Sequence, residues 1–215
     1  MSKLPKFPDS YIGKAANEYD SAVWMERNQK KTTLKLLNLL RDPHLGPSIN
    51  VKENFSNIIL ELGCGTGFSS EIILNHGFRV IGIDILWDML SLAKEKFRDN
   101  KSNHLHFIMA DINYLPIRMK KIDHVLSVSA YNFIIHGLKS TQQIKKVLNA
   151  TTRQINDCLK AHGRVIIEFY PKNEKELTLF VESFLNNGFE GFMIKKKPNQ
   201  KGGQTFLLLK KKYSE

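Results

Sequence analysis

From Asn57 onwards, short apolar runs alternate with stretches typical of helices, and this alternation constrains the fold more than any other feature of the sequence. The predicted strands are NIILELG, FRVIGIDI, LHFIMAD, IDHVLSVSA and GRVIIEFY, followed by GFEGFMIKK and QTFLLLKKK. The predicted helices are 69–75, 87–97, 141–159 and 174–186. This alternation is typical of a doubly wound α/β sheet. The last two strands have no helix between them, which predicts an antiparallel C-terminal hairpin at one edge of a mostly parallel sheet.

The length of the chain fits one substantial core, because it has 215 residues of which 42% are hydrophobic. No apolar run approaches the roughly 18 residues of a membrane span, and the first residues lack the apolar segment of a secretory signal. We therefore expect an intracellular protein with no membrane partner. Cys64 and Cys158 lack metal-ligand spacing, which predicts two reduced thiols and no metal site. Residues 13–41 place apolar side chains among good helix formers, which predicts one or two helices.

The first predicted strand ends in a loop with three glycines, Gly63, Gly65 and Gly67, before a helix begins. Glycine lets main-chain N–H groups approach a ligand closely, and the start of a helix adds a positive dipole end. A dinucleotide-binding loop needs glycine where Phe68 stands, and no Gly-Lys-Ser or Gly-Lys-Thr follows for a nucleoside triphosphate. The loop, with Glu61 two residues before it, therefore favours another kind of cofactor.

Two aspartates close the next two predicted strands. Asp84 lies where the loops after neighbouring strands converge, so its carboxylate can accept hydrogen bonds from ribose hydroxyls. Asp111 can accept the amino proton of an adenine, and Ile112 beside it can pack on the ring. Each aspartate taken alone also fits a helix cap or a turn.

The glycine loop and the two aspartates, found in this order, resemble the class I S-adenosylmethionine-dependent methyltransferases. The resemblance implies a Rossmann-like domain over residues 51–215 and a helical extension over residues 1–50 that covers the cofactor site. S-adenosyl-L-methionine is then the expected cofactor. The residues implied to bind it are Glu61, Gly63, Cys64, Gly65, Gly67, Asp84, Ile85, Asp111, Ile112 and Ser127, together with Tyr19, Arg27 and Gln29 of the N-terminal helices.

The acceptor of the methyl group should be recognised at the end of the fourth strand, in SVSAYNFI. This segment lacks the Pro-Pro of amino-group methyltransferases and the cysteine of cytosine C5 enzymes. It suits a ring atom such as guanine N7, which carries its own lone pair and needs no base. Tyr131, Phe133 and Tyr170 are candidate stacking groups, and Asn132 is a candidate for hydrogen bonds to a base edge. Each aromatic could equally well be core or rim packing.

Over nearly its whole length the chain is similar to the eukaryotic 18S ribosomal RNA guanine-N7 methyltransferase family. The similarity rests on EYDSAVWMERNQKKTTLKLLNLL, ELGCGTGFSSEII, GIDILWDML and SVSAYNFI, and above all on EFYPKN. It implies methylation of guanine N7 in small-subunit ribosomal RNA during ribosome biogenesis. It also places Pro171 and Lys172 beside the mouth of the site, although Pro171 could simply end a strand. Asn132 and Phe133 stand where relatives commonly have Gln and Trp.

The resemblance further implies a partner, a small zinc-binding activator that pairs with an edge strand of the sheet. In this chain that strand is LHFIMAD, with Leu105, Phe107, Ile108 and Met109 as contact residues, and a bare apolar edge strand would favour aggregation. The alternative is an edge covered by the chain itself. The resemblance implies localisation in the nucleus or nucleolus and the cytoplasm, although the Lys/Arg-rich tail that is typical of relatives is absent from this sequence.

The net charge of +11, from 32 Lys and Arg against 21 Asp and Glu, favours a polyanionic partner, which could be RNA, DNA or an anionic membrane, or else a basic surface that only aids solubility. Lys195, Lys196 and Lys197 are expected to form a basic hairpin tip that contacts RNA, or else a solvated loop. Two other functions stay open. One is an assembly factor whose binding role outweighs methylation, and the other is a small-molecule methyltransferase.

Overall fold

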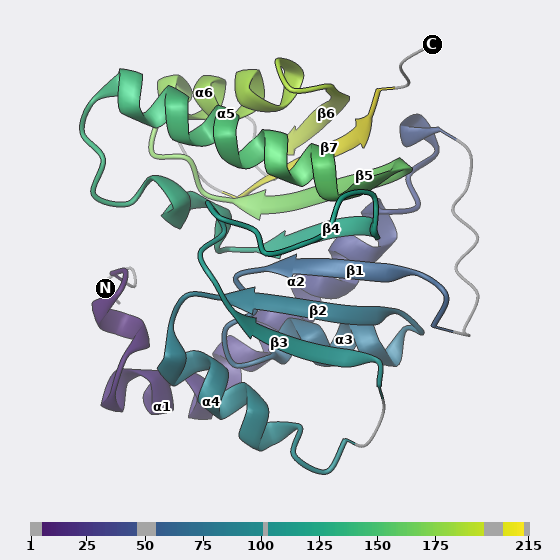
Figure 1. The fold of residues 1–215 in the computed structure, drawn as a ribbon. Helices are drawn as coiled ribbons and strands as arrows, with labels where there is room; N and C mark the ends of the chain where they lie inside the picture. The colour runs from purple at the N-terminus through teal and green to yellow at the C-terminus, as the bar shows by residue number, and fades with distance from the viewer. Residues whose placement is uncertain (1–5, 47–54, 101–102, 196–203, 213–215) are drawn as a thin grey trace.

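The computed structural model describes residues 6–46, 55–100, 103–195 and 204–212 (Figure 1). These residues form one seven-stranded sheet in the order β3-β2-β1-β4-β5-β7-β6. Strands β1 to β5 are parallel, and β7 is antiparallel to both β5 and β6. The predicted doubly wound sheet with an antiparallel C-terminal hairpin is confirmed. The strands are β1 (Ile58–Leu62), β2 (Arg79–Asp84), β3 (Leu105–Met109), β4 (Ile122–Val128), β5 (Leu159–Phe169), β6 (Phe189–Lys195) and β7 (Thr205–Lys211).

The helices begin and end within one residue of the predicted positions in the sheet domain. They are α3 (Phe68–Asn75), α4 (Trp87–Lys96), α5 (Thr141–Cys158) and α6 (Glu174–Leu185), preceded by α1 (Lys14–Ser21) and α2 (Val23–Leu39). Short 3-10 helices occur at η1 (Asp9–Tyr11), η2 (Pro43–Leu45) and η3 (Tyr131–Ile135). Among these described helices, none combines the length and the apolar character that a membrane crossing requires.

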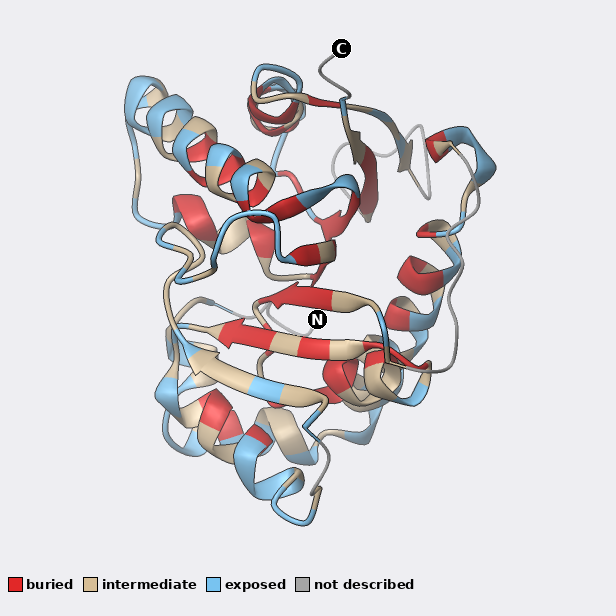
Figure 2. Ribbon diagram, turned by 45° about the vertical axis from the view of Figure 1, so that its right-hand side comes forward, coloured by how far each residue is buried: buried red, intermediate tan, exposed pale blue. Residues whose placement is uncertain are grey.

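Helices cover both faces of the sheet, and each face has its own buried cluster. Helices α5 and α6 pack on one face through side chains such as Leu148 and Phe180, and α2 and α3 pack on the other through Leu36 and Ile73. Figure 2 shows the consequence along the sheet, since the central strands are mostly buried while β3 is intermediate or exposed along its length. Parallel strands buried on both faces explain the continuous apolar runs in the sequence.

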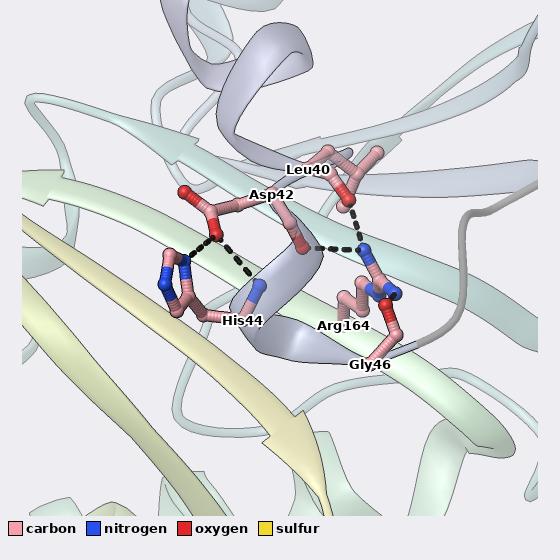
Figure 3. A network of polar contacts seen from close by, with 5 residues as sticks. All are labelled: Leu40, Asp42, His44, Gly46 and Arg164. Atoms are coloured by element: carbon pink, nitrogen blue, oxygen red, sulfur yellow. Dashed lines mark hydrogen bonds and ion pairs between the residues drawn. The ribbon is translucent and has the colours of Figure 1, made fainter.

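A buried arginine fastens the end of α2 to the sheet (Figure 3). Arg164 of β5 is only 3% exposed, and its guanidinium donates to the carbonyl oxygens of Leu40 at 2.6 Å, Gly46 at 3.2 Å and Asp42 at 3.5 Å. A cation at the C-terminal end of a helix also interacts favourably with the helix dipole. The N-terminal helices are therefore an integral part of the fold. The predicted domain boundary at residue 50 lies outside the described residues.

Candidate active site

The three glycines of the β1–α3 loop all adopt the left-handed backbone conformation. Their φ values are 74° for Gly63, 53° for Gly65 and 84° for Gly67, where L side chains are strained. A Cβ atom on Gly63 would lie 2.2 Å from the Cβ of Ala130, the residue before η3. The loop can therefore contact the end of β4 only because this position carries no side chain.

Glu61 lies buried beneath the loop, with 1% of its surface exposed. Its carboxylate accepts a hydrogen bond from the Ser70 hydroxyl at 2.5 Å, and burial raises its pKa to about 7. Burial also raises the pKa of the Cys64 thiol, which keeps the thiol protonated. A cation at this loop would be stabilised by the ionised form of Glu61, and S-adenosylmethionine carries two positive groups. The loop therefore fits the expected cofactor.

Asp84 links the end of β2 to the glycine loop. Its two carboxylate oxygens accept the main-chain N–H groups of Gly65 and Leu86, each at 2.9 Å. A carboxylate offers about four acceptor positions, so two remain for the hydroxyls of a ribose. Ile85 follows it and is half exposed, and it provides an apolar surface beside the carboxylate.

Asp111 and Ser127 differ in how far they are available to a ligand. Asp111 is partly buried, follows the end of β3, and accepts the N–H of Asn113 at 2.8 Å. It keeps further acceptor capacity for an adenine amino group, and Ile112 adjoins it. Ser127 is fully buried in β4, and its hydroxyl donates to the carbonyl of Leu62 at 2.8 Å. Ser127 therefore links two strands, and the expectation that it contacts the cofactor is wrong.

The wall opposite the glycine loop consists of η3 and the segment after β5. The side-chain amide of Asn132 donates to the carbonyl of Tyr170 and accepts its N–H, both at 2.9 Å. This paired contact holds the two segments together, so Asn132 positions Tyr170 and is only partly free for a base edge. Tyr170 is 47% exposed and can offer an aromatic face. Pro171 is buried behind it, while Lys172 is exposed.

Tyr131 does not belong to this wall. It is fully buried and contacts Phe180 and Phe184 of α6, with ring centroids 5.6 and 5.7 Å apart. The expectation that Tyr131 stacks on the acceptor is therefore wrong, because its ring faces the core. Phe133, two residues later on the 3-10 helix, faces the other way and is half-buried.

The comparisons with known proteins agree with this geometry. Residues 59–163 match the model of a methyltransferase domain. The 18S rRNA (guanine-N(7))-methyltransferase of Schizosaccharomyces pombe is 26% identical over 195 residues, which are 90% of this chain and 67% of that protein. The 18S rRNA (guanine(1575)-N(7))-methyltransferase of Saccharomyces cerevisiae is 28% identical over 195 residues, 89% and 64% of the two chains.

The solved structures show the same fold at low sequence identity. Geranyl diphosphate C-methyltransferase from Streptomyces coelicolor, in complex with S-adenosyl-L-homocysteine, superposes with a TM-score of 0.65 at 10% identity, covering 95% of this chain and 83% of that one. The chain therefore has the fold of the class I S-adenosylmethionine-dependent methyltransferases. Its resemblance to the 18S rRNA guanine-N7 enzymes is confirmed, although it spans only 52% to 67% of the length of such relatives.

Helix α1 and the residue before it contact the elements that follow the glycine loop and β2. Tyr19 is partly buried and lies against Phe68, with ring centroids 6.2 Å apart, and a hydrogen bond joins it to Gln29. Burial raises the pKa of Tyr19 well above its usual value, so it stays a neutral donor. Arg27 is exposed and makes no ion pair or side-chain hydrogen bond to any described residue. The structure thus places Tyr19 beside Phe68 at the start of α3, with Gln29 as its hydrogen-bond partner, while the predicted role of Arg27 stays a prediction.

Five contacts around the glycine loop and the N-terminal segment were not predicted from the sequence. Lys96 of α4 donates to the Asp20 carboxylate at 2.7 Å and to the carbonyl of Thr66, in the glycine loop, at 3.0 Å. Asp88 accepts the N–H of Gly13 at 2.6 Å. Phe7 and Tyr11 reach Phe133, with ring centroids 4.7 and 5.8 Å apart. No motif marks these residues, because the contacts depend on how α1 folds back over the sheet.

The β3 edge of the methyltransferase carries the predicted partner residues. Met109 is 60% exposed, and Leu105, Phe107 and Ile108 are partly buried. A hollow of about 260 Å³ lies beside this edge, lined by Phe97, Leu105, His106 and Phe107 among others. In the part of the chain that the structure describes, no three His, Cys, Asp or Glu side chains gather closely enough to hold a metal ion.

The end of β6 and the start of β7 lie at the same end of the sheet as the end of β5. Thr205 at the start of β7 pairs with Phe169 at the end of β5 and with Lys195 at the end of β6. The Lys195 ammonium lies 2.8 Å from the Glu174 carboxylate, so part of its charge is already balanced. Lys196 and Lys197 lie outside the described residues.

Proposed function

We propose that this methyltransferase transfers a methyl group from S-adenosylmethionine to N7 of a guanine in small-subunit ribosomal RNA, during assembly of the subunit in the nucleus and cytoplasm. The observation that carries the proposal is the wall formed by Tyr170 and Asn132 opposite the glycine loop. Tyr170 belongs to the EFYPKN segment, which the generic methyltransferase fold does not require, and Asn132 belongs to SVSAYNFI. Curated relatives named for this reaction match most of the chain.

Methylation at guanine N7 requires the protein mainly to hold the two reactants in position. Guanine N7 has a lone pair available at neutral pH, so no side chain has to remove a proton before the methyl group is transferred. The half-exposed aromatic face of Tyr170 can hold the purine ring by stacking. Bound S-adenosylmethionine supplies the methyl group on an electron-poor sulfur. Catalysis then depends on holding the two reactants in line and excluding water between them.

Binding of RNA is supported by charge. A net charge of +11 on 215 residues favours phosphate contacts, and Lys172 is exposed beside the wall while Lys195 marks the hairpin at the same end of the sheet. Because phosphate contacts release counterions, methyl transfer to RNA should weaken steeply as salt rises. A rate of methyl transfer to RNA that did not change with salt concentration would contradict this part of the proposal.

The partner that we propose is a small zinc-binding activator that extends the sheet at β3. The support is physical, since β3 has only β2 as a neighbour among the described strands, and its edge bears the exposed Met109 and the hollow lined by Phe97 and Phe107. A strand added at this edge would satisfy the outward main-chain groups of β3 and cover the apolar side chains.

The test is co-expression with and without the activator, followed by methyl transfer from radiolabelled S-adenosylmethionine to small-subunit ribosomal RNA and mapping of the modified base. We expect one guanine to be methylated at N7. Asp84→Ala should abolish transfer, and Asp157→Ala, an exposed change at the far end of α5, should not. A wild-type complex that binds the cofactor but leaves this RNA unmodified would overturn the proposal.

One observation favours a second function, methylation of a small molecule. Phe7 stacks on Phe133 at 4.7 Å and Tyr11 lies against the same ring, so the N-terminal segment covers part of the acceptor wall. A covered wall suits a small acceptor better than a nucleotide within a long RNA. This function predicts transfer to a free metabolite with a rate that does not change with salt.

A further inference from the structure

Glu168 is a buried carboxylate that the reaction described so far does not use. It is the last residue but one of β5, and only 1% of its surface is exposed. A buried carboxylate is costly unless hydrogen bonds compensate for the lost water. The hydrogen-bond partners of Glu168 therefore indicate its role in the structure.

Three donors from three separate segments meet at this carboxylate. The Ser129 hydroxyl, just after β4, donates to Oε2 at 2.6 Å. The Tyr170 hydroxyl donates to Oε1 at 3.0 Å, and the side-chain amide of Gln204, just before β7, donates to the same oxygen. An ionised carboxylate accepts hydrogen bonds only, so it can satisfy all three donors at once.

Tyr170 is consequently fixed at both of its ends. Asn132 holds its main-chain N–H and carbonyl, and Glu168 holds its hydroxyl. Burial and the charge of Glu168 both raise the pKa of Tyr170, so the hydroxyl remains a donor. A tyrosine with one half-exposed ring and every polar atom engaged has little freedom to turn, so its aromatic face has a fixed direction.

The same carboxylate also supports the cofactor side of the site. Ser129 has a φ of 56°, an unusual conformation for a residue with a side chain, and its N–H donates to the Glu168 carbonyl at 3.1 Å. The next residue, Ala130, occupies the space next to Gly63 of the glycine loop. Glu168 therefore connects Ser129, whose neighbour Ala130 contacts the glycine loop, with the ring of Tyr170.

We propose that Glu168 is a positioning residue for the methyl acceptor, which fixes the Tyr170 ring relative to the glycine loop through its hydrogen bonds to Tyr170 and Ser129. The inference rests on the proposed function in one respect, since it takes the acceptor to be a ring that stacks on Tyr170. The sequence did not predict a role for Glu168, because the apolar run GRVIIEFY around it predicts only a buried strand.

A double-mutant cycle between Glu168 and Tyr170 tests the inference in the full chain with its activator. Glu168→Gln should lower kcat/KM for the RNA about tenfold, mostly by raising KM, and should leave the Kd for S-adenosylhomocysteine within about threefold. Tyr170→Phe should have a similar effect. Because the two residues act through one bond, the double variant should be no worse than about tenfold. Glu182→Gln, an exposed change on α6, is the control.

The opposite results are equally clear. If the two losses multiply to about a hundredfold, Glu168 does not act through Tyr170, and the inference is overturned. If Glu168→Gln weakens cofactor binding and acceptor binding alike, its role is general stability. Should Glu168→Gln not fold, the cycle between Ser129→Ala and Tyr170→Phe keeps the carboxylate in place and still measures whether its two bonds are coupled.

A second readout separates this inference from the proposed function. The chain can be labelled with 3-fluorotyrosine, and the fluorine NMR signal of Tyr170 can be assigned by its loss in Tyr170→Phe. We expect one narrow Tyr170 signal that broadens or shifts in Glu168→Gln and is unchanged in Glu182→Gln. An unchanged signal would overturn the inference whatever the acceptor is. Wild-type protein that is inactive on RNA but shows the expected signals would instead count against the proposed function alone.

Discussion

The cofactor side and the acceptor side of this active site are held in different ways. On the cofactor side, main-chain geometry dominates, since the three glycines adopt positive φ and Asp84 accepts two main-chain N–H groups. On the acceptor side, polar side chains join segments that are distant in the sequence, since the Asn132 amide bonds the main chain of Tyr170 and the Glu168 carboxylate accepts from the Ser129 hydroxyl. The cofactor side is therefore sensitive to any added atom, whereas the acceptor side depends on particular polar groups.

The largest expected effect comes from adding one carbon atom to the glycine loop. Gly63→Ala places a Cβ 2.2 Å from the Cβ of Ala130 at a φ of 74°, so strain and overlap together should cost about 4 kcal/mol and abolish binding of S-adenosylhomocysteine. Calorimetric titration and denaturant unfolding measure the two effects.

Gly137→Ala is a matched control for that substitution. Gly137 also has a positive φ, 79°, but a Cβ there would meet nothing within 4 Å. We expect a cost of about 1 kcal/mol from backbone strain alone, with cofactor binding retained. Equal losses in the two variants would show that the close approach to Ala130 is not what the loop requires.

The next effect is a pH dependence caused by Glu61. Its folded-state pKa of about 7 lies above the usual 4.5, so the stability that the protonated group contributes is complete below about pH 4.5 and is lost as pH rises through 7. This group should cost the wild type about 3 kcal/mol between pH 4.5 and pH 8. Glu61→Gln should remove that part of the slope in urea unfolding.

The measurement for Glu61 compares the slopes of unfolding free energy against pH for wild type, Glu61→Gln and Glu182→Gln. Glu182 is exposed on α6, so its removal should leave the slope as in the wild type. A slope that survives in Glu61→Gln would mean that another group titrates in this range.

The smallest expected effect is on the acceptor side. Asn132→Ala removes both hydrogen bonds to the Tyr170 main chain, and we expect kcat/KM for the acceptor to fall about tenfold while the Kd for S-adenosylhomocysteine stays within about threefold. Asn149→Ala is the control, because this asparagine also makes two side-chain hydrogen bonds, to Lys145 and Asn187 on the far side of α5. Equal weakening of cofactor and acceptor binding by Asn132→Ala would remove the distinction between the two sides.

The same difference explains what the sequence could predict. The glycine loop and Asp84 were predictable because tight turns and strand ends demand particular residue types locally. Glu168, Lys96 and Phe7 were missed because each has partners far along the chain, such as Ser129 for Glu168, Asp20 for Lys96 and Phe133 for Phe7. Tyr131 was assigned wrongly, since the aromatic pattern of YNF does not reveal which side of a 3-10 helix faces the core.

The hydrogen bond from Arg164 to Leu40 joins residues 124 positions apart in the chain. Contacts of such long sequence separation form late, because a large loop has to close first. While the ribosome makes this protein, α2 emerges well before β5, so the carbonyls at its end have no guanidinium to meet. The end of α2 can therefore be fastened to the sheet only after about three quarters of the chain has been synthesised, so a shorter nascent chain should lack this contact.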